Sequence, residues 1–181
     1  MLRTLLNCFA AMDGAADLKG AARFELHFKP DIASLGIVRR FVAGMYRRSL
    51  SDPEAASRIA LATHELLENA ARYAKGGEAT IRIEVDLERR PRPITIMLRN
   101  RAEPANIAAI REILDGVAGA PSSSTFFQQR LVRSVETADR SGGIGLARIC
   151  AECDMRLTSR VVGEDVSVIE ATTSLTDRAA R

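Results

Sequence analysis

Three polar side chains of one predicted helix have the types and the spacing needed to bind a metal ion and phosphate. In the segment THELLENAARYA, Glu65, Asn69 and Arg72 stand at positions i, i+4 and i+7. A helix places such residues within about 40° of one another on its surface. Asn69 could then offer a carbonyl oxygen to Mg²⁺, Glu65 could act as a base, and Arg72 could bind phosphate. The pattern also fits the solvent-facing stripe of an ordinary amphipathic helix.

A glycine-rich segment further along the chain predicts the second half of such a site. Gly142, Gly143 and Gly145 stand at the start of an apolar helix in SGGIGLARIC. Glycines let backbone N–H groups approach an anion closely, and the dipole of the following helix favours negative charge there. Taken alone, the segment also suits a packing or capping device. Together with the polar stripe, it predicts a phosphate site.

The elements that must position these residues predict a layered fold. Apolar periodicity predicts strands over 22–29, 79–87, 94–99, 155–162 and 166–174, and helices over 31–50, 53–74, 106–117, 126–135 and 143–152. Ser51-Asp52-Pro53 predicts the start of the second helix, and Gly76-Gly77 predicts its end. Neighbouring strands follow one another as hairpins rather than as βαβ crossovers. We therefore expect a two-layer α/β (α+β) sandwich, with a mixed, largely antiparallel sheet and helices on one face.

Composition limits the classes of protein to consider. The 181 residues include 26 Lys and Arg against 23 Asp and Glu, and 46% are hydrophobic, which fits one globular domain with short appendages. No apolar run reaches the roughly 18 residues of a membrane span. Arginines are interleaved with acids and aromatics are few, so we expect no nucleic-acid partner and no membrane partner. Three cysteines are too few for a disulfide framework and indicate the cytoplasm.

Two further patterns predict no chemistry of their own. His64 and Glu65 begin like the zinc motif HExxH, but Glu68 stands where the second histidine is needed. Cys150 and Cys153 form a CxxC pattern without a partner pair, and we expect them to be small buried side chains.

The two motifs resemble those of the GHKL-type ATPases, the Bergerat fold of histidine-kinase catalytic domains, and most closely the small anti-sigma-factor serine kinases. HELLENAARYA is similar to the family's N-box, GGIGLARI to its glycine box and IVRRFVAGMYRRSL to its first helix. The resemblance covers roughly residues 24–174. It implies that Glu65 is the base for the partner's hydroxyl, that Asn69 binds Mg²⁺, and that Arg72 and Tyr73 contact phosphate and ribose. It also implies that the glycine box caps the phosphates of ATP through Gly142, Gly143, Ile144, Gly145 and Leu146.

The middle box departs from the family pattern. Where relatives have an Asp that accepts the adenine amino proton, followed by glycines, this chain reads Asn100-Arg101-Ala102. The resemblance places Asn100 and Ala102 at the base, where a neutral amide oxygen accepts a hydrogen bond without charge assistance. Weaker nucleotide binding or an altered base preference follows as a hypothesis. A subgroup of these kinases that resembles this chain also has Asn at this position.

The resemblance implies roles for two more regions. Thr172 lies near where relatives place a threonine beside adenine, although β-propensity explains it equally well. Residues 119–142 would form the lid over ATP, in which Arg130, Arg133 and Arg140 are either phosphate contacts or solvated arginines. The ATPase domain would span residues 21–175, between an N-terminal extension of residues 1–20 and a tail of residues 176–181.

Three functions remain open. The first is a Mg²⁺-ATP-dependent serine/threonine kinase that phosphorylates a small regulatory protein, similar to an anti-sigma-factor antagonist, in bacterial signalling. The second is a nucleotide-gated module that sequesters a sigma factor or an antagonist without phosphoryl transfer, and Asn100 and Ala102 favour it. The third is an orphan histidine-kinase catalytic domain, which the lack of a preceding phosphoacceptor helix disfavours. Kinases of this type often dimerise, so the resemblance is also compatible with a homodimer.

Overall fold

The described part of the chain forms one sheet covered by helices. The computed structural model describes residues 20–29, 32–50, 52–136 and 143–175. The strands are β1 (Ala21–Phe28), β2 (Ala74–Asp86), β3 (Arg92–Ala102), β4 (Arg156–Val162) and β5 (Val166–Leu175). The helices are α2 (Ile32–Leu50), α3 (Pro53–Tyr73), α4 (Pro104–Gly119), α5 (Ser123–Glu136) and α6 (Ile144–Glu152). No helix in these ranges is both long enough and apolar enough to cross a bilayer.

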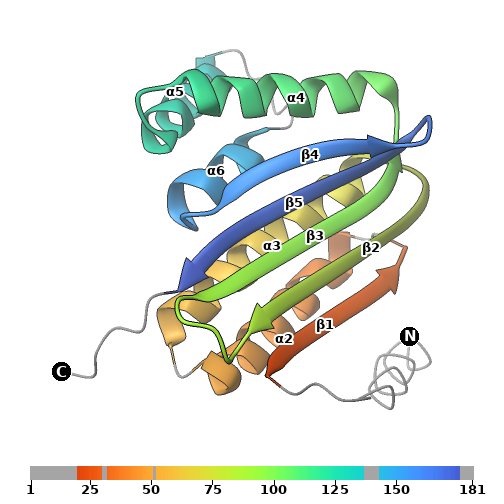
Figure 1. The fold of residues 1–181 in the computed structure, drawn as a ribbon. Coiled ribbons are helices and arrows are strands. Elements are labelled where there is room, and N and C mark those ends of the chain that lie inside the picture. Colours follow the sequence, from red (N-terminus) through yellow and green to blue (C-terminus); the bar gives the residue numbers. More distant parts are fainter. Residues whose placement is uncertain (1–19, 30–31, 51, 137–142, 176–181) are drawn as a thin grey trace.

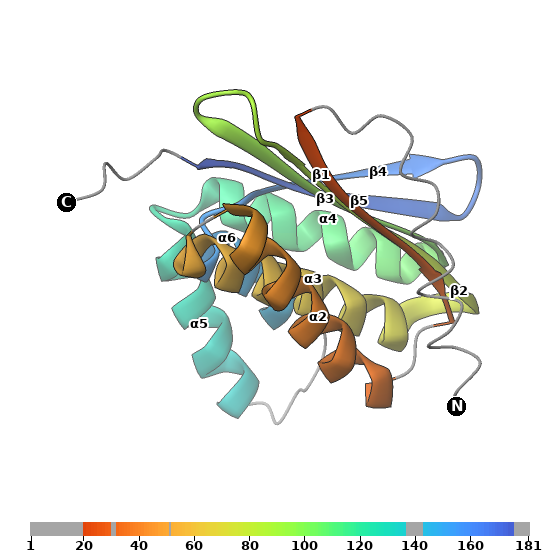
Figure 2. The same ribbon diagram turned by 90° about the horizontal axis from the view of Figure 1, so that it is seen from below.

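The sheet is antiparallel throughout its described strands. Their spatial order is β1-β2-β3-β5-β4, and each neighbouring pair is antiparallel. Figure 1 looks onto the open face of the sheet, and Figure 2 shows the helices gathered on its other side. The predicted two-layer sandwich is therefore confirmed, and every described strand pair has the antiparallel geometry that was expected for most of the sheet.

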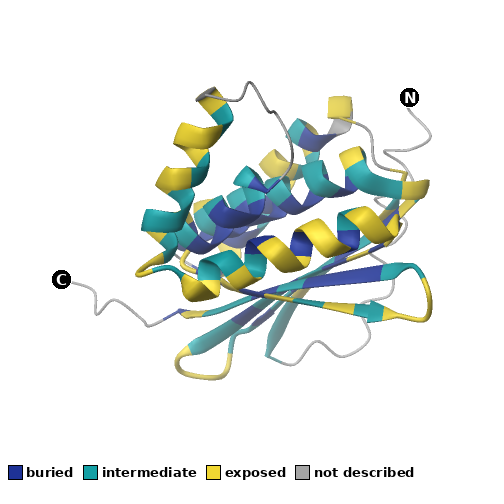
Figure 3. Ribbon diagram, turned by 90° about the horizontal axis from the view of Figure 1, so that it is seen from above, coloured by how far each residue is buried: buried dark blue, intermediate teal, exposed yellow. Residues whose placement is uncertain are grey.

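The core lies between the sheet and α3. Alternate residues of the central strands face the helices, and their apolar side chains, such as Ile83 on β2 and Ile96 on β3, are fully buried. Leu66 and Leu67 of α3 meet them from the other layer. Figure 3 shows the buried parts of the helices turned toward the sheet. Because each such side chain contributes about 1.5–3 kcal/mol on burial, this packing determines which residues of α3 face outward.

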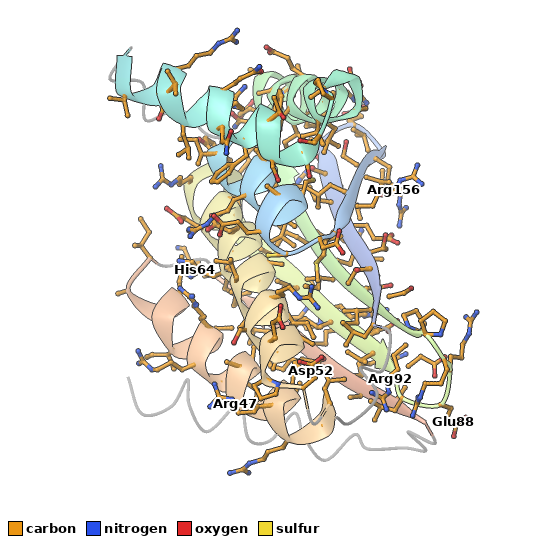
Figure 4. The ribbon with its side chains drawn as sticks, turned by 90° about the vertical axis from the view of Figure 1, so that its left-hand side faces the viewer. Arg47, Asp52, His64, Glu88, Arg92 and Arg156 are labelled. Atoms are coloured by element: carbon orange, nitrogen blue, oxygen red, sulfur yellow. The ribbon has the colours of Figure 1, made fainter. Side chains whose placement is uncertain are left out.

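Helix α3 begins at the predicted position. The Asp52 carboxylate accepts hydrogen bonds from the backbone N–H groups of Glu54 and Ala55, both at 3.0 Å. Pro53 takes the first helical position, where its missing N–H is not needed. Figure 4 shows Asp52 at this end of the helix. The cap predicted from Ser51-Asp52-Pro53 is confirmed for the two residues that the structure describes.

The strand after α3 begins earlier than predicted. β2 starts at Ala74, directly after the helix, whereas the sequence predicts a start at Ala79. Ala74 pairs with Ala102, and the register shifts before Ala79. Gly76 and Gly77 lie in this irregular stretch at φ values of 75° and 74°, which glycine adopts readily. Helix α3 therefore ends at Tyr73, before the two glycines that were expected to end it, and the glycines lie in an irregular part of the strand instead.

The two helices before the glycine segment are longer than predicted. α4 begins at Pro104 rather than at residue 106, with proline in the first turn. α5 begins at Ser123 rather than at residue 126. The Ser122 hydroxyl oxygen accepts a hydrogen bond from the N–H of Thr125 at 3.0 Å, which caps this helix. The connection between the two helices is correspondingly short.

Candidate functional site

A cleft of about 440 Å³ lies between α3, α5 and α6. Its volume is within the range of about 300–1,000 Å³ that is typical of small-molecule sites. The lining consists of residues from α3, one residue from α5 and the start of α6: Glu65, Glu68, Asn69, Arg72, Tyr73, Ser134, Gly143, Ile144, Gly145 and Leu146. The two predicted halves of the site, the polar stripe and the glycine segment, therefore meet across one cleft.

The amphipathic pattern of α3 turns its polar stripe toward the cleft. Leu66 and Ala70, each one position after a residue of the polar stripe, are buried in the core. Tyr73, the residue after Arg72, is only partly buried and reaches the cleft. All four residues of this helix with a predicted ligand or catalytic role line the cleft: Glu65, Asn69, Arg72 and Tyr73.

Glu68 is a cleft residue that the sequence reasoning did not assign to the site. Its Oε1 atom accepts a hydrogen bond from Nη2 of Arg72. The two residues are four positions apart on the helix, and this spacing is the signal that could have identified the pair. A guanidinium has five N–H donors. Glu68 therefore orients the Arg72 side chain and leaves other donors for an anion.

The start of α6 requires glycine for two close contacts. Gly143 is the N-cap and has a φ of 117°, which glycine tolerates far better than other residues. A Cβ atom on Gly143 would lie 2.4 Å from Cδ1 of Ile113, and one on Gly145 would lie 2.6 Å from Oε2 of Glu65. The free N–H groups of a helix start attract anions. Gly142, the remaining glycine of the predicted box, lies outside the described residues.

Glu65 is the more enclosed of the two cleft carboxylates. Its side chain is 10% exposed, against 31% for Glu68. Its Oε1 atom accepts a hydrogen bond from Nη1 of Arg148 at 3.2 Å, and the Nε of Arg148 donates to Glu152 at 2.8 Å. The hydrogen bond to Glu152 is the main cause that raises the pKa of Arg148. No sequence signal reveals the Glu65–Arg148 pair, because it depends on how α3 and α6 are oriented.

Asn100 and Ala102 lie at the end of β3, outside the lining of the cleft. Both are buried on the side of the sheet that faces the helices. Nδ2 of Asn100 donates a hydrogen bond to the carbonyl oxygen of Arg101 at 2.8 Å. Directly across from Asn100 on β5 is Ser167, which is also buried. Sequence reasoning did not identify this polar pair, which the strand register creates.

Thr172 does not lie beside Asn100 and Ser167. It pairs with Thr95 on β3 and with Arg156 on β4, five residues further along β5 than Ser167. Residues that lie opposite one another in an antiparallel sheet share a face. Figure 4 shows Arg156 directed away from the helices. The structure therefore places Thr172 on the open face, whereas the hydroxyl beside Asn100 belongs to Ser167.

Comparison with known proteins shows the family of this chain. The model of the histidine kinase-like ATPase domain family matches residues 28–155. The chain belongs to this family. Among solved structures, a chain of the SiaB–SiaC complex from Pseudomonas aeruginosa has a similar fold, with a TM-score of 0.67 and 12% sequence identity over 96% of this chain and 100% of that chain. None of the curated proteins matches the sequence.

Within this histidine kinase-like ATPase domain, the described part of the predicted lid contributes Ser134 of α5 to the cleft lining. The guanidinium of Arg130 also lies at the glycine segment, since a Cβ atom on Gly143 would be 3.1 Å from its Nη2 atom. Arg133 is exposed on the same helix, and Arg140 lies outside the described residues. Of the two lid arginines that lie within the described residues, Arg130 is the one whose placement suits contact with phosphate.

The CxxC pattern of the ATPase domain is structural. Cys150 and Cys153 are buried free thiols, as predicted. Burial raises the pKa of Cys153 to about 12, which disfavours the thiolate that metals and oxidants require. In the part of the chain that the structure describes, no three His, Cys, Asp or Glu side chains are grouped to hold a metal ion.

Proposed function

We propose that this ATPase domain is a Mg²⁺-ATP-dependent serine/threonine protein kinase that phosphorylates a small regulatory protein. The observation that carries the proposal is the meeting of Glu65, Asn69 and the start of α6 in one cleft. A carboxylate base, an oxygen ligand for Mg²⁺ and an anion-binding helix start are groups that transfer of a phosphoryl group from ATP to a hydroxyl uses.

The phosphates of ATP would bind at the start of α6. The first N–H groups of this helix have no partner within the helix, and its dipole favours negative charge. Arg72 offers the donors that Glu68 does not use, and Arg130 adds positive charge beside Gly143. Positioning and electrostatic stabilisation supply most of the catalysis in phosphoryl transfer, so this wall of the cleft supports the proposed reaction.

The oxygen donors of the cleft fit Mg²⁺. This ion is usually held by one or two protein groups together with substrate phosphates, rather than by a cage of side chains. Asn69 offers an amide oxygen, and the Glu68 carboxylate lies on the same wall. When bound, the ion supplies positive charge that neutralises phosphate oxygens. We assign Asn69 as its protein ligand.

Glu65 would orient the acceptor hydroxyl and take its proton. In the reaction, the hydroxyl oxygen forms a bond to the γ-phosphorus. The bond from the γ-phosphorus to the bridging oxygen breaks, and ADP leaves with that electron pair. The hydroxyl proton passes to the carboxylate of Glu65. Positioned general bases of this kind contribute about 10²- to 10⁴-fold to a rate.

We assign the base of the nucleotide to the buried row formed by Asn100 and Ser167, with Ala102 at its edge. The amide oxygen of Asn100 would accept a hydrogen bond from the amino group of adenine. Because Asn100 is neutral, this bond lacks the charge assistance of a carboxylate. We expect moderate nucleotide affinity for this reason. Tyr73, on the cleft wall, is assigned to the ribose.

A protein acceptor is supported by the match to the SiaB–SiaC complex, in which a chain of similar fold was solved together with another protein. The acceptor that we propose is a small antagonist-like regulator in bacterial signalling, with a sigma factor as the alternative partner. Both would meet the kinase in the cytoplasm.

The test compares Glu65→Gln with the wild-type protein in two measurements. Calorimetry gives the Kd for Mg²⁺-ATP, and γ-³²P-ATP added with the pure protein to a bacterial extract reveals a labelled acceptor. We expect Kd to change by less than about twofold, because the variant keeps the size of the side chain, and labelling to fall by about a hundredfold or more. Glu78→Gln, which alters an exposed carboxylate of β2, is the matched control and should match the wild type. Undiminished labelling by Glu65→Gln would refute the assignment.

A second function, a nucleotide-gated binding module without transfer, is favoured by the neutral Asn100 in the base row. It predicts that a protein from the same extract is retained by the ATP-loaded protein and is released when ATP is removed. In this case the retained protein never acquires ³²P.

A further inference from the structure

We infer that Arg148 is a positioning residue, which holds the carboxylate of Glu65 in the orientation that receives the acceptor proton. The inference rests on the proposed role of Glu65 as the base. Arg148 is not among the residues that line the cleft. It would therefore act on the reaction through Glu65 rather than through contact with ATP.

Both oxygens of the Glu65 carboxylate lie against the same helix. Its Oε2 atom faces Gly145, whose Cβ atom, if present, would lie only 2.6 Å away. Its Oε1 atom accepts the hydrogen bond from Nη1 of Arg148 at 3.2 Å. Gly145 and Arg148 are three residues apart, so they occupy one face of α6. This face of α6 therefore determines the direction of the carboxylate plane.

The guanidinium of Arg148 is itself held from a second side. Its Nε atom donates to Oε2 of Glu152 at 2.8 Å, and Glu152 is one helical turn away on α6. A guanidinium is planar and presents its donors in a fixed fork. The hydrogen bond from Nε to Glu152 therefore also sets the direction of Nη1, the atom that donates to Glu65. A lysine could pair with Glu65 but could not transmit this orientation as well.

The enclosure of Glu65 makes the pair necessary for the position of the carboxylate. A largely buried carboxylate needs a hydrogen-bonded cation, since an unpaired buried charge is costly. Arg148 is the cation that bonds to Glu65, and the dipole of α6 adds a weaker attraction at its start. Without the guanidinium, the carboxylate is expected to turn toward water in the cleft. A displacement of about 1 Å of a catalytic group can reduce a rate about a hundredfold.

The experiment measures Arg148→Met, Arg148→Lys and Glu152→Gln in the full chain. The readouts are kcat and KM for Mg²⁺-ATP with the acceptor labelled in the extract, and the Tm of each variant. We expect Arg148→Met to lower kcat about ten- to a hundredfold and to change KM less than about twofold, because Arg148 does not touch the nucleotide. Arg148→Lys should have a kcat between those of Arg148→Met and the wild type, and Glu152→Gln should lower kcat a few-fold.

Arg82→Met is the matched control. It also removes an arginine that is paired with a carboxylate, Glu25, but this pair lies on β2 and β1 at the other side of the molecule from α6. Its kcat should equal that of the wild type. An unchanged or increased kcat in Arg148→Met would overturn the inference, as would a loss that follows the Tm and appears equally in KM.

Failure of the proposed function gives a different result. In that case the wild-type protein labels no acceptor. Glu65 then has no catalytic role, and the inference about Arg148 fails with it. A double-mutant cycle of Glu65→Gln and Arg148→Met on thermal unfolding then shows separately whether the two side chains are coupled. A cycle without coupling would contradict the contact itself.

Discussion

The two ends of the candidate nucleotide site are built in different ways. The phosphate end is an open cleft formed by helix surfaces of α3, α5 and α6. The base end is a buried row on β3 and β5, where Asn100 and Ser167 are 5% and 3% exposed. In the proposed site, anion binding would therefore depend on cleft side chains and backbone amides, whereas base recognition would depend on two neutral side chains at the edge of the core.

This difference separates the effects of substitution. Loss of a cleft side chain that is not buried in the core, such as Asn69, should change affinity more than folding. A buried polar group must keep its hydrogen bonds, as Asn100 does with the carbonyl of Arg101. Changes at the base end should therefore affect both folding and affinity. Inorganic triphosphate with Mg²⁺ is a probe for the phosphate end, and adenosine is a probe for the base end.

The largest effect on stability is expected for a substitution at Gly143, where the phosphate end contacts the core. Gly143→Ala puts a side chain at a φ of 117° and into Cδ1 of Ile113. The backbone term is about 1 kcal/mol or more and overpacking adds about 1–3 kcal/mol, so the free energy of unfolding should fall by about 2–4 kcal/mol. Urea unfolding measures this loss, and binding of Mg²⁺-triphosphate should weaken with it.

Gly163→Ala is the matched control for this change. Gly163 also has a positive φ, 67°, in the β4–β5 turn, but a Cβ atom added there would have no neighbouring atom within 4 Å. It should lose only the backbone term of about 1 kcal/mol. Equal losses at Gly143 and Gly163 would mean that the close approach of α6 to α4 does not require glycine.

The second effect concerns Asn69, the proposed metal ligand of the phosphate end. Asn69→Ala removes the amide oxygen from the cleft wall, and interactions with charged groups are worth about 1.5–3 kcal/mol. Titration calorimetry should therefore show Mg²⁺-triphosphate binding about ten- to a hundredfold more weakly, with adenosine binding unchanged. Excess EDTA should abolish the difference between the variant and the wild type. A difference that persists in EDTA would assign Asn69 to the phosphates rather than to the metal.

The phosphate end could be predicted from the sequence because its signals are local. The spacing of Glu65, Asn69 and Arg72 is a property of one helix, and the glycines precede the helix that needs them. The antiparallel hairpins and the helical layer were also predictable, since short connections and periodicity indicate them. What local patterns could not provide is the orientation of α6 against α3, and hence the pairing of Glu65 with Arg148.

The base end could be predicted only in part. Asn100 stands at the end of a clearly apolar strand, so its position was evident. Its neighbour across the sheet depends on the β3–β5 register, and a shift in register changes both the partner and the face of a residue. The pairing places Ser167 beside Asn100 and moves Thr172 to the open face. Ser167 and Thr172 both carry a hydroxyl group on β5, and without the register the sequence does not show which of them lies beside Asn100.

The third effect tests the base end through its amide. Asn100→Leu replaces the amide by an apolar group of similar size, so adenosine and ATP should bind about three- to tenfold more weakly, as expected for a neutral hydrogen bond of about 0.5–1.5 kcal/mol. Binding of Mg²⁺-triphosphate should stay within about twofold of the wild type. Competition binding with ATP and GTP compares the base preference of Asn100→Leu with that of the wild type. Loss of triphosphate binding in a folded variant would show that the two ends are not separable.

The smallest effect decides which hydroxyl on β5 belongs to the base end. Ser167→Ala removes one neutral donor from the buried row, so adenosine affinity should fall about threefold, within the lower range for a single hydrogen bond. Thr172→Ser, which keeps a hydroxyl on the open face, and Thr172→Ala should both leave adenosine affinity unchanged, because Thr172 pairs with Thr95 and Arg156 on the side without helices. If Thr172→Ala weakens adenosine binding and Ser167→Ala does not, the base lies elsewhere along β5, and the buried row with Asn100 is structural only.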